Sequence, residues 1–170
     1  MTDATLTVPP AAPGVSSGPT ALILDTNIVL DLLLFGDPAA MALQAQLQAV
    51  LAQPAQWRWI ATQPMREELR HVLAYAHLQP RLAYYRREPA QILAHFDAGV
   101  ELVEIAAATV FRCKDGDDQK FIDLAVAHQA VLLSKDKAVL RLRKRLARVG
   151  VQVDTQLPLP AAASGGAFWF

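Results

Sequence analysis

Short apolar runs alternate with helical patterns along this chain, and this alternation most constrains its fold. Residues 21–24 and 131–133 have the length and apolar composition of strands that are buried on both faces. Further strands are predicted at about 57–61, 100–105 and 151–153. Because helical patterns separate the strands, the sequence predicts an α/β fold built on a parallel sheet.

The segments between the predicted strands carry helix signals. Asp37 and Pro38 have the N-cap and first-turn arrangement, and Thr62 with Pro64 starts a second such helix. Helices are predicted at about 27–35, 38–53, 63–77, 79–87, 89–98, from near 117, and at 136–149.

One domain, residues 21–155, accounts for the periodic part of the 170-residue chain. Residues 1–20 and 156–170 are rich in small residues and proline, and we expect a flexible leader and a flexible tail. No stretch is long and apolar enough to predict a membrane span, and one cysteine, Cys113, suits a reducing compartment. These features predict a cytoplasmic protein without membrane contact.

Four acidic residues carry the functional prediction: Asp25, Glu68, Asp118 and Asp136. Each lies downstream of a short apolar run, and ligands of open α/β sheets bind beyond the carboxyl ends of the strands. Carboxylates gathered at one edge repel one another unless a cation lies among them. Hard oxygen ligands favour Mg²⁺ or Mn²⁺ over zinc. The set therefore predicts metal-assisted phosphodiester chemistry.

Each acid also has an ordinary structural explanation. Asp25, Asp118 and Asp136 could be helix N-caps, and Glu68 could be a solvated helix acid beside two arginines. The register leaves alternatives open, because Glu67 could replace Glu68, and Asp115 or Asp117 could replace Asp118. Three neighbouring polar residues could orient the carboxylates or serve in simple turns. These are Thr26, Asn27 and Ser134.

Four segments resemble the PIN domain when they are taken in order: DTNIVLD, EEL followed by HVL, CKDGDDQKFIDLA, and LLSKDKAVL. The resemblance runs from about residue 21 to residue 153 and is closest to the bacterial toxins of toxin–antitoxin pairs. It implies a five-stranded parallel sheet with helices on both faces, in three α/β/α layers, and a divalent-metal-dependent ribonuclease. The family's acids fall on Asp25, Glu68, the pair Asp117 and Asp118, and Asp136. Two positions depart from the usual pattern, since Gly116 and Ser134 stand where proline and threonine are common.

Substrate and partner contacts must be local, because the formal net charge is zero. The predicted nucleic-acid-binding residues are Arg141, Arg143, Lys144 and Arg145, although a solvated helix face would have the same composition. Three tyrosines amid arginines suit an antitoxin surface or a homodimer contact, with core packing as the alternative. They are Tyr75, Tyr84 and Tyr85.

Two other function classes compete with an RNA-cleaving enzyme. The first is a catalytically silent PIN-like module that binds RNA or a protein. The second is a phosphatase of the DxD type, but Asn27 stands where its second aspartate would be.

Overall fold

Five parallel strands form the centre of the structure, a computed structural model that describes residues 18–157. The strands are β1 (Thr20–Leu24), β2 (Trp57–Ala61), β3 (Glu101–Leu102), β4 (Val131–Leu133) and β5 (Gln152–Asp154). Their order in the sheet is β3-β2-β1-β4-β5, and every neighbouring pair is parallel. The predicted five-stranded parallel sheet is confirmed.

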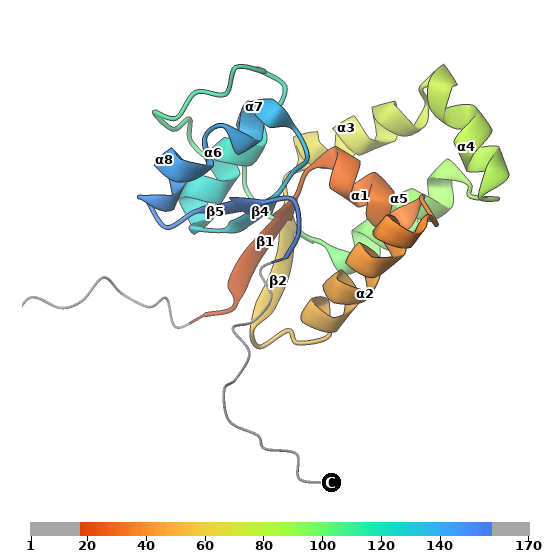
Figure 1. Cartoon of the computed structure of the whole chain (residues 1–170), viewed down its shortest axis with the longest axis horizontal. Helices are drawn as coiled ribbons and strands as arrows, with labels where there is room; N and C mark the ends of the chain where they lie inside the picture. The colour runs from red at the N-terminus through yellow and green to blue at the C-terminus, as the bar shows by residue number, and fades with distance from the viewer. Residues whose placement is uncertain (1–17, 158–170) are drawn as a thin grey trace, which may run out of the picture.

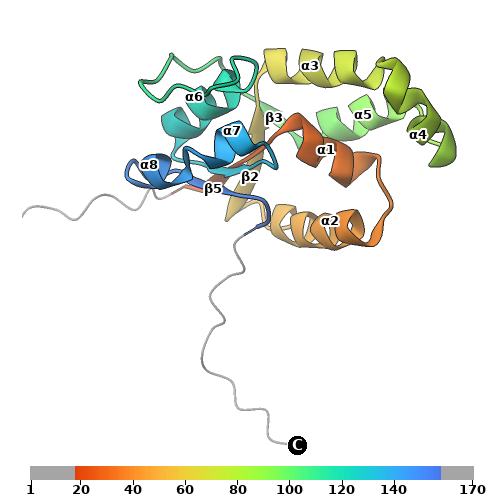
Figure 2. The same ribbon diagram turned by 45° about the horizontal axis from the view of Figure 1, so that its top comes forward.

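Helices cover both faces of this sheet (Figures 1 and 2). They are α1 (Thr26–Leu33), α2 (Pro38–Leu51), α3 (Gln63–Leu73), α4 (Gln79–Tyr84), α5 (Pro89–Gly99), α6 (Gln119–His128), α7 (Lys137–Leu140) and α8 (Arg143–Ala147), with a 3₁₀ turn, η1 (Ala76–Leu78). Helices α1–α5 lie on one side in both views, and α6–α8 lie on the other. This is the expected three-layer α/β/α arrangement.

The central strands are buried on both faces, as their continuous apolar runs predict. Leu22 and Ile23 in β1 and Leu132 and Leu133 in β4 have no exposed surface. Burial of such side chains contributes about 1.5–3 kcal/mol each to folding. The core therefore fixes β1 and β4 firmly, together with the residues that immediately follow them.

Three predicted elements differ from the structure. Strand β3 is shorter than 100–105 because β2 ends at Ala61, so the ladder stops after the bond from the Val103 N–H to the Ala61 carbonyl. Helix α3 ends at Leu73 rather than near 77, where i→i−3 bonds tighten its last turn. The predicted helix 136–149 is divided into α7 and α8 by a similar tight turn, in which the Leu142 N–H bonds to the Val139 carbonyl.

The order in which strands are added to the sheet reverses between β1 and β4, although the two strands run parallel. Strand β1 leads to β2 on one side, and β4 leads to β5 on the other. Leu24 pairs with Leu133, and the Asp25 N–H donates to the Leu133 carbonyl at 3.0 Å. The carboxyl ends of these two strands therefore lie side by side at a topological switch point, where open α/β sheets bind ligands.

The predicted leader and tail fall almost wholly outside the described residues. Within residues 18–157, none of the helices is by itself long and apolar enough to cross a membrane. Helices α1 and α2 reach the required length and apolar composition only when they are taken together, and the chain bends by 96° between them.

Candidate active site

Asp25 lies directly beyond β1 and is only 4% exposed. The Ser134 hydroxyl donates to its Oδ2 at 2.6 Å, and the Asn27 backbone N–H donates to its Oδ1 at 3.4 Å, which makes Asp25 the N-cap of α1. Burial raises the pKa of Asp25 above its ordinary value. The hydrogen bonds from Ser134 and Asn27 oppose this shift, and the nearby charges of Glu68 and Asp136 add to it.

Ser134 connects the two strand-end carboxylates. Its hydroxyl donates to Asp25 and accepts from the backbone N–H of Asp136 at 3.0 Å. Asp136 caps α7, since its Oδ1 accepts from the Ala138 N–H at 2.6 Å. The capping role considered from the sequence is therefore present at Asp136, and it leaves the second carboxylate oxygen without a protein partner among the described residues.

Glu68 is held by side chains from two other elements. The Thr26 hydroxyl donates to its Oε1 at 2.5 Å, and the Lys120 ammonium forms an ion pair with its Oε2. Glu67 instead pairs with Arg70 and Arg66. The structure thus brings Glu68, and not Glu67, to the other acids, and Glu68 is not the freely solvated helix acid of the alternative interpretation.

Asp118 stands at the start of α6, but its side chain makes no capping hydrogen bond. Its pKa is raised to about 7, first by burial and then by the nearby charges of Asp25, Asp136, Asp115 and Glu68. Asp117 is exposed and is absent from the charges that act on Asp25 and Asp118. Asp118 is therefore the member of the predicted pair that faces the other carboxylates.

We call these four carboxylates, Asp25, Glu68, Asp118 and Asp136, the acidic rim. Their elements converge at the carboxyl end of β1, between α3 and α7 (Figure 1). Within residues 18–157, no three His, Cys, Asp or Glu side chains form a ready-made metal-ligand group. The rim thus brings its charges close enough to contribute to the raised pKa values of Asp25 and Asp118, while Thr26, Lys120 and the backbone bind several of its oxygens.

Sequence reasoning missed two lysines at this edge. Lys120 neutralises part of the Glu68 charge, and Lys135 forms an ion pair with Asp31, which is only 8% exposed in α1. The only sequence signal for Lys120 is its position two residues after Asp118. Lys135 is marked only by its place between Ser134 and Asp136.

Of the three predicted orienting residues, two use their side chains. Thr26 and Ser134 each donate a hydroxyl hydrogen bond to a rim carboxylate. Asn27 contacts the rim through its backbone N–H, and its side chain is exposed. Small hydroxyl residues therefore fix the direction of Asp25 and Glu68.

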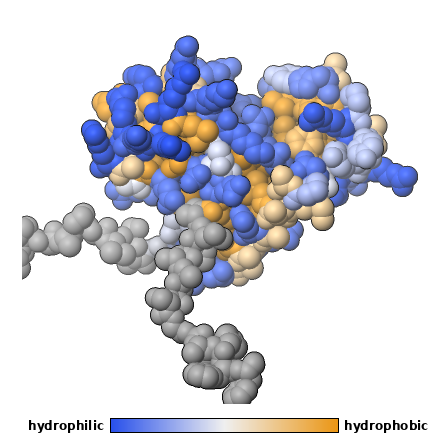
Figure 3. All heavy atoms as spheres, in the orientation of Figure 1, coloured by the Kyte–Doolittle hydropathy of each residue, from blue (hydrophilic) through white to orange (hydrophobic). Residues whose placement is uncertain are grey.

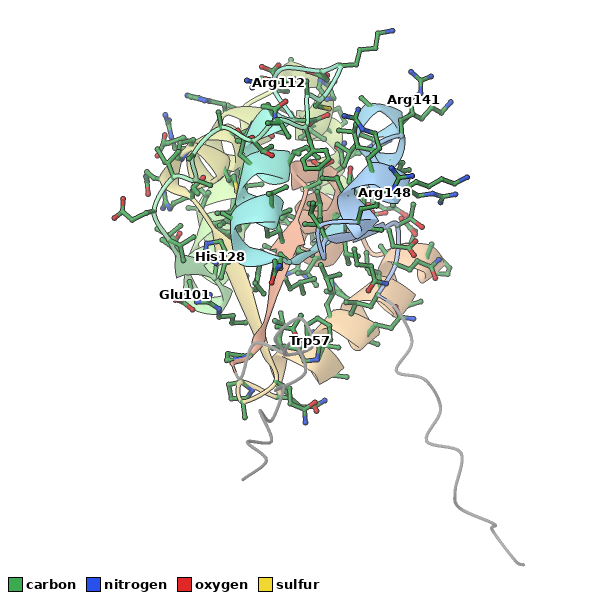
Figure 4. All side chains as sticks on the ribbon, turned by 90° about the vertical axis from the view of Figure 1, so that its left-hand side faces the viewer. Trp57, Glu101, Arg112, His128, Arg141 and Arg148 are labelled. Atoms are coloured by element: carbon green, nitrogen blue, oxygen red, sulfur yellow. The ribbon has the colours of Figure 1, made fainter. Side chains whose placement is uncertain are left out.

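The predicted nucleic-acid-binding residues form an exposed basic face on α7 and α8. We define it by Arg141, Arg143, Lys144, Arg145 and Arg148. None of these residues takes part in the ion pairs found within residues 18–157. Figure 4 shows Arg141 and Arg148 on the outer side of these helices. A shallow hollow of about 430 Å³ lies among Lys137, Leu140 and residues of this face.

Comparison with protein-family models matches residues 21–138 to the PIN domain. The matched segment covers more than half of the chain and contains all four residues of the acidic rim. Comparison with curated proteins gives no match.

Proposed function

Because the chain belongs to the PIN domain family, whose members are generally nucleases, we propose that it is a metal-dependent endoribonuclease that hydrolyses RNA phosphodiester bonds. The observation that carries this proposal is the acidic rim at the switch point between β1 and β4. In this rim, burial and the neighbouring charges raise the pKa of Asp118 to about 7. Such a shift is typical of functional sites.

The chemistry of the rim fits a divalent cation, and PIN domains typically bind such ions. Its donors are all carboxylate oxygens, and burial, followed by the charges around them, raises the pKa values of Asp25 and Asp118. Hard oxygen donors favour Mg²⁺ or Mn²⁺. Asp25, Glu68, Asp118 and Asp136 would hold the ion. It would supply a water of lowered pKa as nucleophile and stabilise charge on the phosphoryl oxygens.

The protein's own residues orient the rim. Ser134 fixes the direction of the Asp25 carboxylate and links it to the backbone of Asp136. Thr26 fixes Glu68 against the first turn of α1. Near neutral pH, in the absence of a cation, the Asp118 carboxyl holds a proton part of the time, since its pKa is about 7. No side-chain nucleophile is needed for hydrolysis of this kind.

The basic face supports RNA as the substrate. Its guanidinium and ammonium groups are exposed and form no ion pairs among the described residues, so they are available to phosphates. Figure 3 shows a predominantly hydrophilic surface on the α6–α8 side of the molecule. We expect this face to hold the sugar-phosphate backbone beside the rim without reading its sequence.

Cleavage of a labelled single-stranded RNA tests the proposal. We expect cleavage with Mg²⁺ or Mn²⁺, silencing by EDTA, and recovery when either ion is restored, whereas zinc should substitute poorly. Asp25→Asn and Glu68→Gln should each lower the rate by at least about a hundredfold. Glu67→Gln is the matched control, because Glu67 pairs with Arg66 and Arg70 instead of facing the rim, and it should leave the rate nearly unchanged.

Asp25→Asn should also leave thermal stability unchanged or raised, since a neutral amide removes repulsion from a buried site and still accepts hydrogen bonds. Undiminished cleavage in excess EDTA would overturn the metal-dependent mechanism. If Asp25→Asn kept full activity and had a lowered melting temperature, the role of Asp25 would be that of a helix cap and not that of a catalytic residue.

Within this proposal, the chain is the toxin of a toxin–antitoxin pair. Expression alone should then slow growth, and Asp25→Asn should abolish the effect. The antitoxin protein would place a basic or apolar side chain against the acidic rim. Harmless expression of a chain that cleaves RNA in vitro would instead indicate a housekeeping RNA-processing enzyme. A silent binding module would take up Mn²⁺ without any functional consequence.

A further inference from the structure

Two neighbouring hollows lie between α1 and the segment from the end of α3 through α4. The first, of about 480 Å³, is lined by residues that include Asn27, Val72, Tyr75 and His77. The second, of about 440 Å³, is lined by Tyr84 among others. Phe35 and Arg81 line both. We call the two hollows together the aromatic groove.

Aromatic rings in this groove are presented to solvent. Tyr84 is 80% exposed and Tyr75 is 49% exposed. The Tyr75 and His77 rings lie 5.6 Å apart, and Tyr84 lies 4.9 Å from Tyr85 in an edge-on arrangement. Tyr85 and Phe35, whose ring centroids lie 6.2 Å apart, both pack partly against the core. The groove thus offers open ring faces of the kind on which nucleic-acid bases stack.

Arg81 supplies the positive charge of the groove. Its guanidinium lies 5.1 Å from the centre of the Phe35 ring and takes part in none of the ion pairs found within residues 18–157. Two acids also line the second hollow, but Asp31 pairs with Lys135 and Asp37 caps α2 through the Ala40 N–H. A cation beside open rings complements a nucleotide, which carries a phosphate and a base.

The first hollow of the groove adjoins the acidic rim at Asn27. Asn27 lines the first hollow, and its backbone N–H donates to Asp25. Val72 and Tyr75 follow Glu68 by one and two turns at the end of α3. A strand with its phosphate at the rim would therefore pass its next bases over this groove.

We propose that the aromatic groove binds unpaired bases of single-stranded RNA beside the phosphate that is cleaved. Tyr75 and Tyr84 stack on bases, and Arg81 contacts the backbone between them. The proposal rests on the nuclease function above and extends it, because it gives the enzyme a preference for unpaired RNA. It assigns to the two exposed tyrosines a role in substrate binding instead of the protein contact considered from the sequence.

Fluorescence anisotropy of a short labelled single-stranded RNA, bound to the Asp25→Asn chain so that no cleavage occurs, tests the groove. In that background, Tyr75→Ala and Tyr84→Ala should each weaken binding about tenfold. Tyr75→Phe and Tyr84→Phe keep the ring and should bind nearly as before. Met41→Ala, an exposed apolar residue on α2, is the control for a change outside the groove. An abasic strand of equal length should bind about tenfold more weakly than the normal strand, a comparison that needs no substitution in the groove.

Equal affinity for normal and abasic strands, or no loss on removal of both tyrosines, would overturn the proposal. If the tyrosine-to-alanine variants kept their RNA affinity but sedimented as monomers where the parent chain is a dimer, the groove would be a protein interface and the proposal would be wrong. If the chain bound normal strands better than abasic strands but did not cleave RNA, the base-binding role of the groove would be supported and only the proposed nuclease function would be contradicted. If the chain cleaved RNA equally fast with and without both tyrosines, only the base-binding role of the groove would be contradicted.

Discussion

The acidic rim has two halves that are built differently. Asp25 and Asp136 follow buried strands, and Ser134 and the backbone fix their positions. Glu68 lies in the middle of α3, and Asp118 lies at the start of α6. Glu68 is bound only through side chains, and Asp118 accepts no hydrogen bond from within residues 18–157.

The difference shows how one site combines rigidity with adjustability. Strands packed on both faces cannot shift without disturbing the core, so the strand-end pair is preorganised. The helix-borne pair can change partners. Glu68 can exchange the Lys120 ammonium, and Asp118 can exchange a proton, for a metal cation without disturbing the packed core. We therefore expect both halves to be needed for activity, and the helix-borne half to determine how the site responds to metal and pH.

Among changes to the residues that hold the rim carboxylates in place, the largest expected effect comes from removing the Ser134 hydroxyl, which organises the strand-end half. Ser134→Ala removes the partner of the Asp25 Oδ2 and of the Asp136 N–H at a position that has no exposed surface, while the Asp25 Oδ1 keeps its bond from the Asn27 N–H. We expect a loss of about 1–3 kcal/mol in the free energy of unfolding and of about 10–100-fold in cleavage rate. Urea denaturation and RNA cleavage measure the two effects.

Thr26→Val is the matched change in the other half. It removes the hydroxyl that binds Glu68, but Lys120 still pairs with that carboxylate. Its losses should be clearly smaller than those of Ser134→Ala. Ser134→Thr retains the hydroxyl and should retain most of the activity. If Thr26→Val proved as damaging as Ser134→Ala, the distinction between a fixed and an adjustable half would fail.

Local patterns were sufficient to predict the strand-end half. The apolar runs predicted β2 and β4 with their observed bounds and β1 to within one residue, because burial on both faces leaves a signature in a few consecutive residues. Asp25 and Asp136 follow from those strands by position alone. The place of Ser134 beside Asp25 follows from the pairing of β1 with β4, which parallel order brings together.

Features that depend on tertiary contacts were not predictable in this way. The end of β3 is set by where its neighbour β2 ends, and the choice of Glu68 over Glu67 is set by the direction in which α3 faces the rim. Lys120 reaches Glu68 from a helix more than fifty residues away in sequence, so no local pattern marks it. The sequence patterns therefore did not determine how each helix is rotated about its axis, and this rotation decides which of its side chains face the rim.

An intermediate effect is expected from the cation in the helix-borne half. Lys120→Met removes the ammonium that pairs with Glu68 and increases the negative charge of the rim by one. Binding of Mn²⁺, followed by electron paramagnetic resonance, should tighten by up to about fivefold, because a partly exposed ion pair contributes about 1 kcal/mol or less. Lys144→Met on the basic face is the control for loss of a charge elsewhere. Weaker Mn²⁺ binding by Lys120→Met alone would indicate that the lysine supports the site instead of competing with the ion.

The smallest expected effect is the pH dependence of stability in EDTA. Burial and the charges of Asp25, Asp136, Asp115 and Glu68 raise the pKa of Asp118 from 3.8 to about 7. Between these values the folded chain binds more protons than the unfolded chain, so the free energy of unfolding falls as the pH rises from about 4 to about 7. Because Asp118 remains partly exposed, solvent screening should limit the effect to about 1 kcal/mol.

Asp118→Asn lacks this group, so urea denaturation at pH 5 and pH 8 should show a smaller decrease for the variant than for the unmodified chain. Other titrating groups are common to both proteins and cancel in the comparison. Identical decreases would mean that Asp118 is no more strained than an ordinary surface carboxylate, and the helix-borne half would then lose its assigned role as the part of the rim that responds to protons.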